Sequence, residues 1–147
     1  MRVLALDLGS KRIGVAVSDP TESIASPDQV IERTGSRARD HKAIAKVVEE
    51  WGAELVVVGL PLSLSGADGP AARATREEAV ELEAALSVPV VVHDERLTTV
   101  TASRTLREAK MTADARRRVV DKVAAAVLLQ SWLDERASRR GRETEMG

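Results

Sequence analysis

The sequence of 147 residues contains no cysteine, no phenylalanine and no tyrosine, and it has only two histidines and two tryptophans. Without cysteine the chain can form neither a disulfide nor a zinc–thiolate site, and it has no thiol nucleophile. With only two histidines, His41 and His93, the composition argues against a histidine-rich metal site. Proteins that read single-stranded nucleic acid usually stack bases on aromatic side chains, so this composition argues against that mode of recognition.

Long hydrophobic runs are also missing. No uninterrupted apolar run of about 18 residues and no N-terminal signal pattern occurs, so we expect a soluble, cytoplasmic protein without a membrane partner. The length is typical of one domain with its own core, and we expect that domain to cover residues 1–137. Residues 138–147 are mostly polar or charged, which predicts a disordered tail.

The net charge is only −1, but the charged residues are unevenly distributed. Residues 1–95 contain 10 Lys and Arg against 16 Asp and Glu, whereas residues 96–147 contain 12 against 7. A basic C-terminal third beside an acidic remainder suits a polyanionic substrate that is reached through metal ions. An ordinary solvated helix surface explains the same distribution equally well.

The spacing of apolar residues predicts an α/β domain with a mixed sheet. Three strands come first, and Pro27 argues for an edge position of the third. Two alternations of helix and strand follow, and the rest of the chain is helical. The expected strands are 3–6, 13–17, 24–31, 55–58 and 88–92, and the expected helices are 39–51, 70–86, 101–109 and 114–137.

Acidic residues stand where apolar elements end. Asp7 follows the first strand, and Glu95, preceded by Asp94, follows the fifth. Carboxylates at the ends of buried strands are costly unless a cation compensates them. A hard divalent metal such as Mg²⁺ or Mn²⁺ compensates oxygen ligands and also supports hydrolysis. The alternative for Asp7 is an ordinary turn in which it caps its own backbone.

Asp121 is the third acidic candidate. At about 100° per residue it falls in the helical stripe of Ala124, Leu128 and Trp132, which should face the sheet. Near the start of its helix it could reach the strand ends, where it would join Asp7 as a metal ligand. A favourable contact with the helix dipole is the alternative explanation.

Four basic residues are candidates for contacts with phosphate groups of a nucleic-acid substrate. Lys11 and Arg12 lie at the tip of the first hairpin, Arg96 follows Glu95, and Arg118 belongs to the basic run before Asp121. For Arg118 a solvated helix surface is an equally good explanation. In the same hairpin, Gly14 leaves room for a close approach of another backbone segment.

Four stretches of the chain resemble the YqgF family, whose members are described as pre-16S ribosomal RNA nucleases and as Holliday-junction-resolvase-like proteins. They span almost the whole chain in family order. The loop at 62–68 departs from the family, because it carries serines and an alanine where asparagine and other polar residues are expected. The matching stretches are LALDLGSKRIGVAVSD (4–19), VVVGLPLSLSGADGP (56–70), VVVHDERLTT (90–99) and VVDKVAAAVLLQSWL (119–133).

The resemblance implies a ribonuclease H-like fold, with a five-stranded mixed sheet in the order 3-2-1-4-5 flanked by helices. It implies Asp7, Glu95 and Asp121 as an acidic triad. The implied activity is metal-dependent hydrolysis of phosphodiester bonds in structured RNA or branched DNA. We expect processing of the 5′ end of pre-16S ribosomal RNA, with Holliday junction resolution as the alternative. A monomer and a homodimer both remain open.

This strand order has a geometric consequence for a metal site. It places the fourth strand between the first and the fifth, so Asp7 and Glu95 would start roughly 10 Å apart at about 4.8 Å per strand. Two metal ions about 4 Å apart could span that gap more easily than one. Gly59, at the end of the intervening strand, would leave them room.

Two functions of other classes are alternatives. One is a non-catalytic module that binds nucleic acid or a transcription factor. The other is a phosphotransferase of the actin and sugar-kinase type, whose first phosphate motif resembles Asp7-Leu8-Gly9 followed by Gly14. That second alternative is disfavoured, because those enzymes close two such domains around ATP and 147 residues supply only one.

Overall fold

The computed structural model describes residues 1–62, 65–95 and 113–146, and within the last helix it describes the side chains of residues 119–141 only. Arg96 and the helix expected at 101–109 lie outside the described residues. The side chain of Arg118 is also outside them, although its backbone belongs to the last helix.

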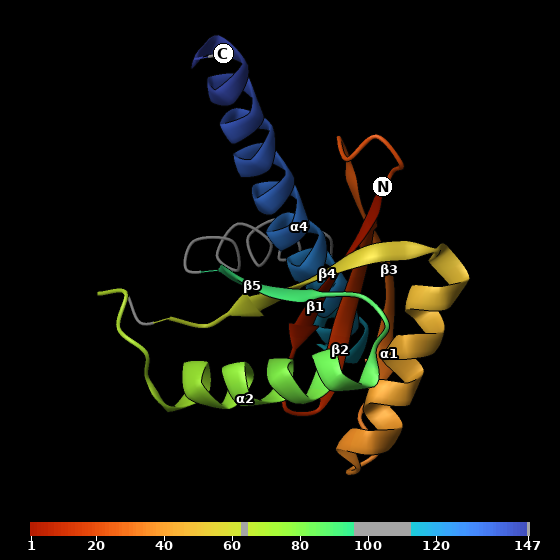
Figure 1. Cartoon of the computed structure of the whole chain (residues 1–147). Helices are drawn as coiled ribbons and strands as arrows, with labels where there is room; N and C mark the ends of the chain where they lie inside the picture. Colours follow the sequence, from red (N-terminus) through yellow and green to blue (C-terminus); the bar gives the residue numbers. More distant parts are fainter. Residues whose placement is uncertain (63–64, 96–112, 147) are drawn as a thin grey trace.

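The described part of the chain forms a five-stranded mixed sheet in the order β3-β2-β1-β4-β5, which confirms the predicted order (Figure 1). β1, β2 and β3 pair antiparallel, whereas β4 pairs parallel with β1 and with β5. β3 is an edge strand, as Pro27 indicated. The strands are β1 (Arg2–Leu8), β2 (Arg12–Ser18), β3 (Ala25–Glu32), β4 (Ala53–Leu60) and β5 (Val90–Asp94).

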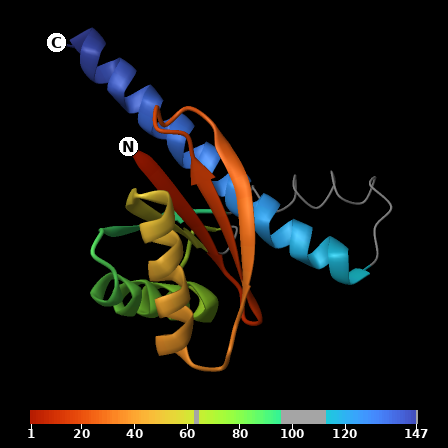
Figure 2. The same cartoon turned by 90° about the vertical axis from the view of Figure 1, so that its right-hand side faces the viewer.

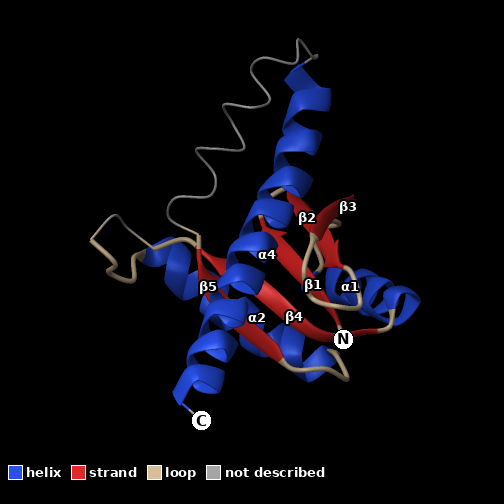
Figure 3. Cartoon of the chain, turned by 90° about the horizontal axis from the view of Figure 1, so that it is seen from above, coloured by secondary structure: helices blue, strands red, loops and turns tan. Residues whose placement is uncertain are grey.

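Two helices, α1 (Arg37–Trp51) and α2 (Pro70–Ala85), lie on one face of the sheet, and α4 (Ala113–Met146) crosses the other (Figures 2 and 3). Ser36 begins α1, since its side chain accepts a hydrogen bond from the Arg39 amide. Gly52 ends α1 in the left-handed conformation, which glycine adopts without steric cost. The fold is therefore a three-layer arrangement around one sheet.

The alternation of side chains along the strands divides the core into two layers. Leu4 and Leu6 of β1 pack toward α1 and α2, whereas Val3 and Ala5 pack toward α4. By the same alternation the next residue on the α4 side is Asp7. The position of Asp7 in the strand thus places its carboxylate on the face that α4 covers.

α4 continues well beyond residue 137, so the structure differs from the disordered tail that the sequence predicted for 138–147. The helix includes residues up to Met146. Arg139 pairs with Glu135 one turn earlier, and Arg140 reaches Glu22 near the start of β3. The first contact is an i,i+4 pair of the kind that stabilises a helix, and the second ties α4 to the segment before β3; apolar spacing reveals neither. Within the described part of the chain, no helix is long and apolar enough to cross a membrane.

Candidate active site

Asp7 lies between two glycines at the carboxyl end of β1. In the antiparallel pair of β1 and β2 its partner is Gly14. On the other side, Leu6 pairs with Val58 of β4, so Gly59 is the next residue alongside Asp7. Neither neighbouring strand therefore carries a side chain next to the Asp7 carboxylate on the face that α4 covers.

Gly14 allows α4 to approach the sheet. A Cβ at this position would overlap the backbone oxygen of Asp121 and would lie 3.1 Å from the amide nitrogen of Lys122. The prediction that Gly14 leaves room for a close backbone approach is confirmed. The consequence is that the backbone of Asp121 rests on β2 directly beside Asp7.

Gly59 makes room for the second acidic side chain. A Cβ at Gly59 would overlap Oε2 of Glu95 and would lie 3.0 Å from Cδ2 of Leu128. Glu95 follows β5, and its amide donates a hydrogen bond to the Leu60 carbonyl at 3.3 Å, which continues the strand pairing by one residue. The Glu95 carboxylate thus lies over the end of β4, toward Asp7.

Burial and neighbouring carboxylates act on the pKa values of Asp7 and Glu95. Burial, and then the charge of Asp121, raises the pKa of Asp7 to about 6. Burial, then Asp7 and then Asp94, raises the pKa of Glu95 to about 7. Asp7 is thus electrostatically coupled to both other acids. Accumulated negative charge of this kind favours a nearby cation.

Arg12 already neutralises one member of the group. Its Nε donates a hydrogen bond to Oδ2 of Asp121 at 2.9 Å, and the two side chains are only 17% and 28% exposed. This pair links β2 to α4. Lys11 is exposed at the hairpin tip next to Arg12. Contacts of Lys11, Arg12, Arg96 and Arg118 with phosphate groups stay predictions.

The donor set suits a hard divalent cation, because all three candidate ligands are carboxylates. Among the residues that the structure describes, however, no three acidic or histidine side chains are close enough together to form a metal site. Asp121 is held by Arg12, while Asp7 and Glu95 carry raised pKa values. The three carboxylates are therefore the right ligand type for a metal ion. A bound ion would have to draw them closer together.

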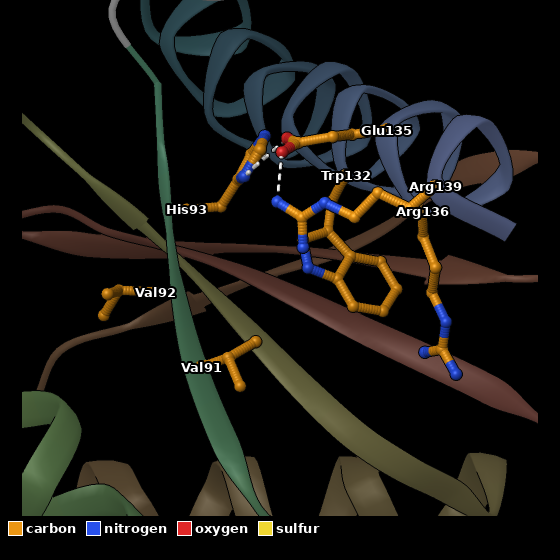
Figure 4. A pocket seen from close by; sticks show the side chains of 7 residues that line it. All are labelled: Val91, Val92, His93, Trp132, Glu135, Arg136 and Arg139. Carbon is orange, nitrogen blue, oxygen red and sulfur yellow. Dashed lines mark hydrogen bonds and ion pairs between the residues drawn. The ribbon is translucent and has the colours of Figure 1, made fainter. Parts of the chain in front are cut away.

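His93 has a structural environment. It precedes Glu95 by two residues and lines a hollow of about 390 Å³ between β5 and α4 (Figure 4). Its Nε2 lies 3.2 Å from the Ser131 hydroxyl, and its Nδ1 lies 3.7 Å from Glu135. Arg139 shares the same Glu135 carboxylate. His93 thus attaches β5 to α4 just before the segment that carries Glu95.

A buried polar cluster on the opposite face of the sheet was missed by sequence reasoning. Arg33, Asp40 and Glu78 were not identified as candidates, although Asp40, His41 and Glu78 are buried and Arg33 is ion-paired with Asp40 and Glu78. One signal could have revealed it. Glu78 falls on the stripe of α2 that buries Thr75 and Leu82, where a charged residue needs a partner.

The chain is similar to known proteins over most of its length. The family model RuvX, described as Holliday junction resolvase, matches residues 1–135. A Myxococcus xanthus protein named "Putative pre-16S rRNA nuclease" is 48% identical over 134 residues, which cover 91% of this chain and 88% of that protein. A protein of the same name from Moorella thermoacetica is 46% identical over 134 residues, covering 91% and 95%.

Among solved structures, RuvC of Thermus thermophilus superposes with a TM-score of 0.55 at 14% identity, covering 94% of this chain and 97% of that one. A second structure, of T. thermophilus RuvC in complex with a Holliday junction substrate, gives the same TM-score at 16% identity, covering 93% and 96%. At this level of identity the likeness concerns the fold, which is ribonuclease H-like.

Proposed function

Since this chain belongs to the RuvX family, we propose that it is a metal-dependent nuclease that hydrolyses phosphodiester bonds with Asp7, Glu95 and Asp121. The observation that carries the proposal is the position of Asp7 between Gly14 and Gly59. The first glycine admits the Asp121 backbone and the second admits the Glu95 carboxylate. Three acids from distant parts of the sequence are thereby directed to one strand end.

The proposed cofactor is Mg²⁺ or Mn²⁺, bound by the three carboxylates; when bound, it would activate water and stabilise charge on the leaving oxygen. Asp7 contributes the most rigid ligand, because it belongs to a central strand. Arg12 holds one oxygen of Asp121 and so orients that carboxylate. Lys11 is exposed beside it and would contact a phosphate of the substrate, a role we also propose for Arg12, Arg96 and Arg118.

Structured RNA is the proposed substrate, with processing of the 5′ end of pre-16S ribosomal RNA as its reaction. The name of relatives at 46–48% identity supports this choice. The near absence of aromatic residues supports recognition by backbone and shape instead of base stacking. This reaction would place the protein in the cytoplasm, with residues 1–137 as the nuclease domain.

A second candidate is cleavage of branched DNA, which is favoured by the description of the matching family as Holliday junction resolvase. Cutting a four-way junction requires two active sites, so this function calls for a homodimer. Processing of an RNA end can be carried out by a monomer. The oligomeric state in solution therefore helps to separate the two candidates.

The experiment compares the wild type with Asp7→Asn in Mg²⁺ and in Mn²⁺, on equimolar precursor ribosomal RNA ends and four-way DNA junctions. Asp134→Asn is the matched control, because Asp134 is exposed on α4 and accepts a hydrogen bond from Gln130 one turn earlier. Cleavage by the wild type and the control, but not by Asp7→Asn, supports the nuclease, and the substrate that is cut decides the ranking. If the wild type binds these substrates without cutting them, the nuclease proposal gives way to a non-catalytic binding module.

A further inference from the structure

Arg33 holds the turn that follows Asp7 from the far side of the sheet. Arg33 comes directly after β3, and its amide donates a hydrogen bond to the Lys11 carbonyl at 2.9 Å. Its side-chain Nε donates a second bond to the Gly9 carbonyl at 2.7 Å. One residue therefore makes two bonds to the hairpin tip that joins β1 to β2.

The rest of the Arg33 guanidinium is fixed by buried partners. Nη1 and Nη2 donate to the two carboxylate oxygens of Glu78 on α2, each at 2.9 Å. Nε2 of His41 on α1 lies 2.9 Å from the same carboxylate. Glu78 is 5% exposed and His41 is 4% exposed. The Gly9 carbonyl is thus connected to both helices of this layer.

Glu78 remains the anion that this arrangement needs. Burial raises the pKa of its carboxyl, but the hydrogen bonds and charges of Arg33 and His41 outweigh burial and lower it. A buried ion pair of this kind is weak evidence for stability, because apolar residues of similar volume often serve as well. A role in orientation explains its presence better than a role in stability does.

Arginine suits this position for a geometric reason. Its planar guanidinium presents a fork of two donors to a carboxylate and a further donor, Nε, in another direction. A lysine carries all its donors on one nitrogen, so it could not reproduce both the fork on Glu78 and the separate bond to the Gly9 carbonyl. The contact geometry at Arg33 therefore depends on arginine itself and not on positive charge alone.

The turn after Asp7 borders an open space. A hollow of about 480 Å³ lies against it, lined by Leu8, Gly9, Ser10, Pro61 and Thr75 among others. The Gly9 amide donates to the Asp7 carbonyl at 3.1 Å, so any movement of Gly9 is passed to the backbone of Asp7. The bond from Arg33 supports the turn beside this open space.

We propose that Arg33, held in place by Glu78 and His41, is a positioning residue that fixes the turn after Asp7 and thereby directs the Asp7 carboxylate. The inference rests on the proposed role of Asp7 in the nuclease reaction. Arg33 itself touches neither the substrate nor a metal ion in this account.

The test uses the full chain with Arg33→Lys and Glu78→Gln, and with Arg37→Ala as the matched control. Arg37 also joins α1 to α2, through an ion pair with Glu81, but both side chains are about half exposed, 47% and 53%. Amide hydrogen exchange at Gly9 is measured by NMR, and kcat and KM are measured on the cleaved substrate. Circular dichroism confirms that each variant is folded.

In Arg33→Lys we expect exchange at Gly9 to rise about tenfold and kcat to fall about tenfold, as loss of one charged hydrogen bond allows, while KM stays within about twofold. Glu78→Gln should shift both quantities in the same direction by less. If Arg33→Lys does not fold, the result for Glu78→Gln decides. Arg37→Ala should leave both quantities at the wild-type values.

The inference is overturned if a folded Arg33→Lys, or Glu78→Gln in its place, shows wild-type exchange at Gly9, whatever its activity. Equal changes of Gly9 exchange and kcat in Arg37→Ala would also overturn it. Any contact between α1 and α2 would then be enough to support the turn. If the wild type cuts no substrate, the proposed function fails. The exchange measurement at Gly9 still decides the role of Arg33 in that case.

Discussion

The Glu95 carboxylate occupies the space that a side chain at Gly59 would fill: a Cβ on Gly59 would overlap Oε2 of Glu95. Gly59 belongs to β4, which separates the strands that carry the two acids. A strand without a side chain at its end lets Glu95 reach toward Asp7 across it. β4 was expected to separate Asp7 and Glu95 by two strand spacings, and the Glu95 side chain extends into that gap above Gly59. The charge of Asp7 contributes to the raised pKa of Glu95.

Gly59→Ala should therefore displace the Glu95 carboxylate and weaken metal binding by about 10–100-fold, the usual cost of disturbing the surroundings of metal ligands. Titration with Mn²⁺, followed by calorimetry, measures the affinity. Gly69→Ala is the matched control, because a Cβ there meets no atom within 4 Å. Wild-type affinity in Gly59→Ala would show that metal binding does not depend on the Glu95 carboxylate occupying the space over Gly59.

Asp7→Asn should stabilise the protein in the absence of divalent metal at neutral pH. The pKa of Asp7 is raised to about 6 from the ordinary 3.8, so the charged form is disfavoured by folding. The ionised Asp7 carboxylate therefore lowers the free energy of unfolding of the wild type. This loss is absent below about pH 4, grows between about pH 4 and 6, and is complete above about pH 6. A shift of this size corresponds to on the order of 1–3 kcal/mol.

The measurement for Asp7→Asn is urea unfolding with EDTA at several pH values. The gain in the free energy of unfolding relative to the wild type should be present at pH 8 and smaller at pH 5. Asp134→Asn, which lies on the exposed side of α4, should show no such gain. A loss of stability in Asp7→Asn at pH 8 would contradict the electrostatic account of this site.

Arg12→Gln should destabilise the protein by about 1 kcal/mol, because it removes a partly buried ion pair between β2 and α4. It also leaves Asp121 without its partner beside Asp7, so the pKa of Asp7 should rise further. NMR titration of the Asp7 carboxyl carbon checks this direction. Arg139→Ala, which breaks the more exposed pair with Glu135 on α4, should leave that pKa unchanged.

Much of the fold follows from local signals in the sequence. Continuous apolar runs marked the strands, and the bounds expected at 13–17 lie within the observed β2. Pro27 marked the edge. Asp7 became a candidate because it follows an apolar run, and Asp121 because it stands on the inward stripe of a helix; their role as site residues stays a prediction. The period of a strand or helix is enough to place a polar residue on a buried face.

Contacts between distant residues could not be predicted in this way. Arg12 meets Asp121 across 109 positions, and Arg33 meets Glu78 across 45. Both pairs depend on how α4 and α2 cross the sheet, which local periodicity does not specify. Glu78 also lies among several glutamates of α2, a composition that is typical of a solvated face. Its spacing with Thr75 and Leu82 was the distinguishing signal.

A divalent ion should stabilise the wild type, and should do so more at pH 8 than at pH 6. Ligand binding to the folded state adds RT ln(1 + [L]/Kd), which is about 2.7 kcal/mol at 100 times Kd. Asp7 and Glu95 titrate at about 6 and about 7, so protons compete with the metal at the lower pH. For a chain of this size the melting temperature should rise by about 5–10 °C at pH 8.

The controls for this stabilisation are Asp7→Asn and Asp134→Asn, heated with Mn²⁺ and with EDTA. Asp134→Asn should gain as much as the wild type, because Asp134 is exposed and lies more than three helical turns beyond Asp121 on α4. Asp7→Asn should gain little, since it lacks the carboxylate that is coupled to both others. An equal gain in all three proteins would mean that the ion binds elsewhere, and would remove Asp7 from the metal site.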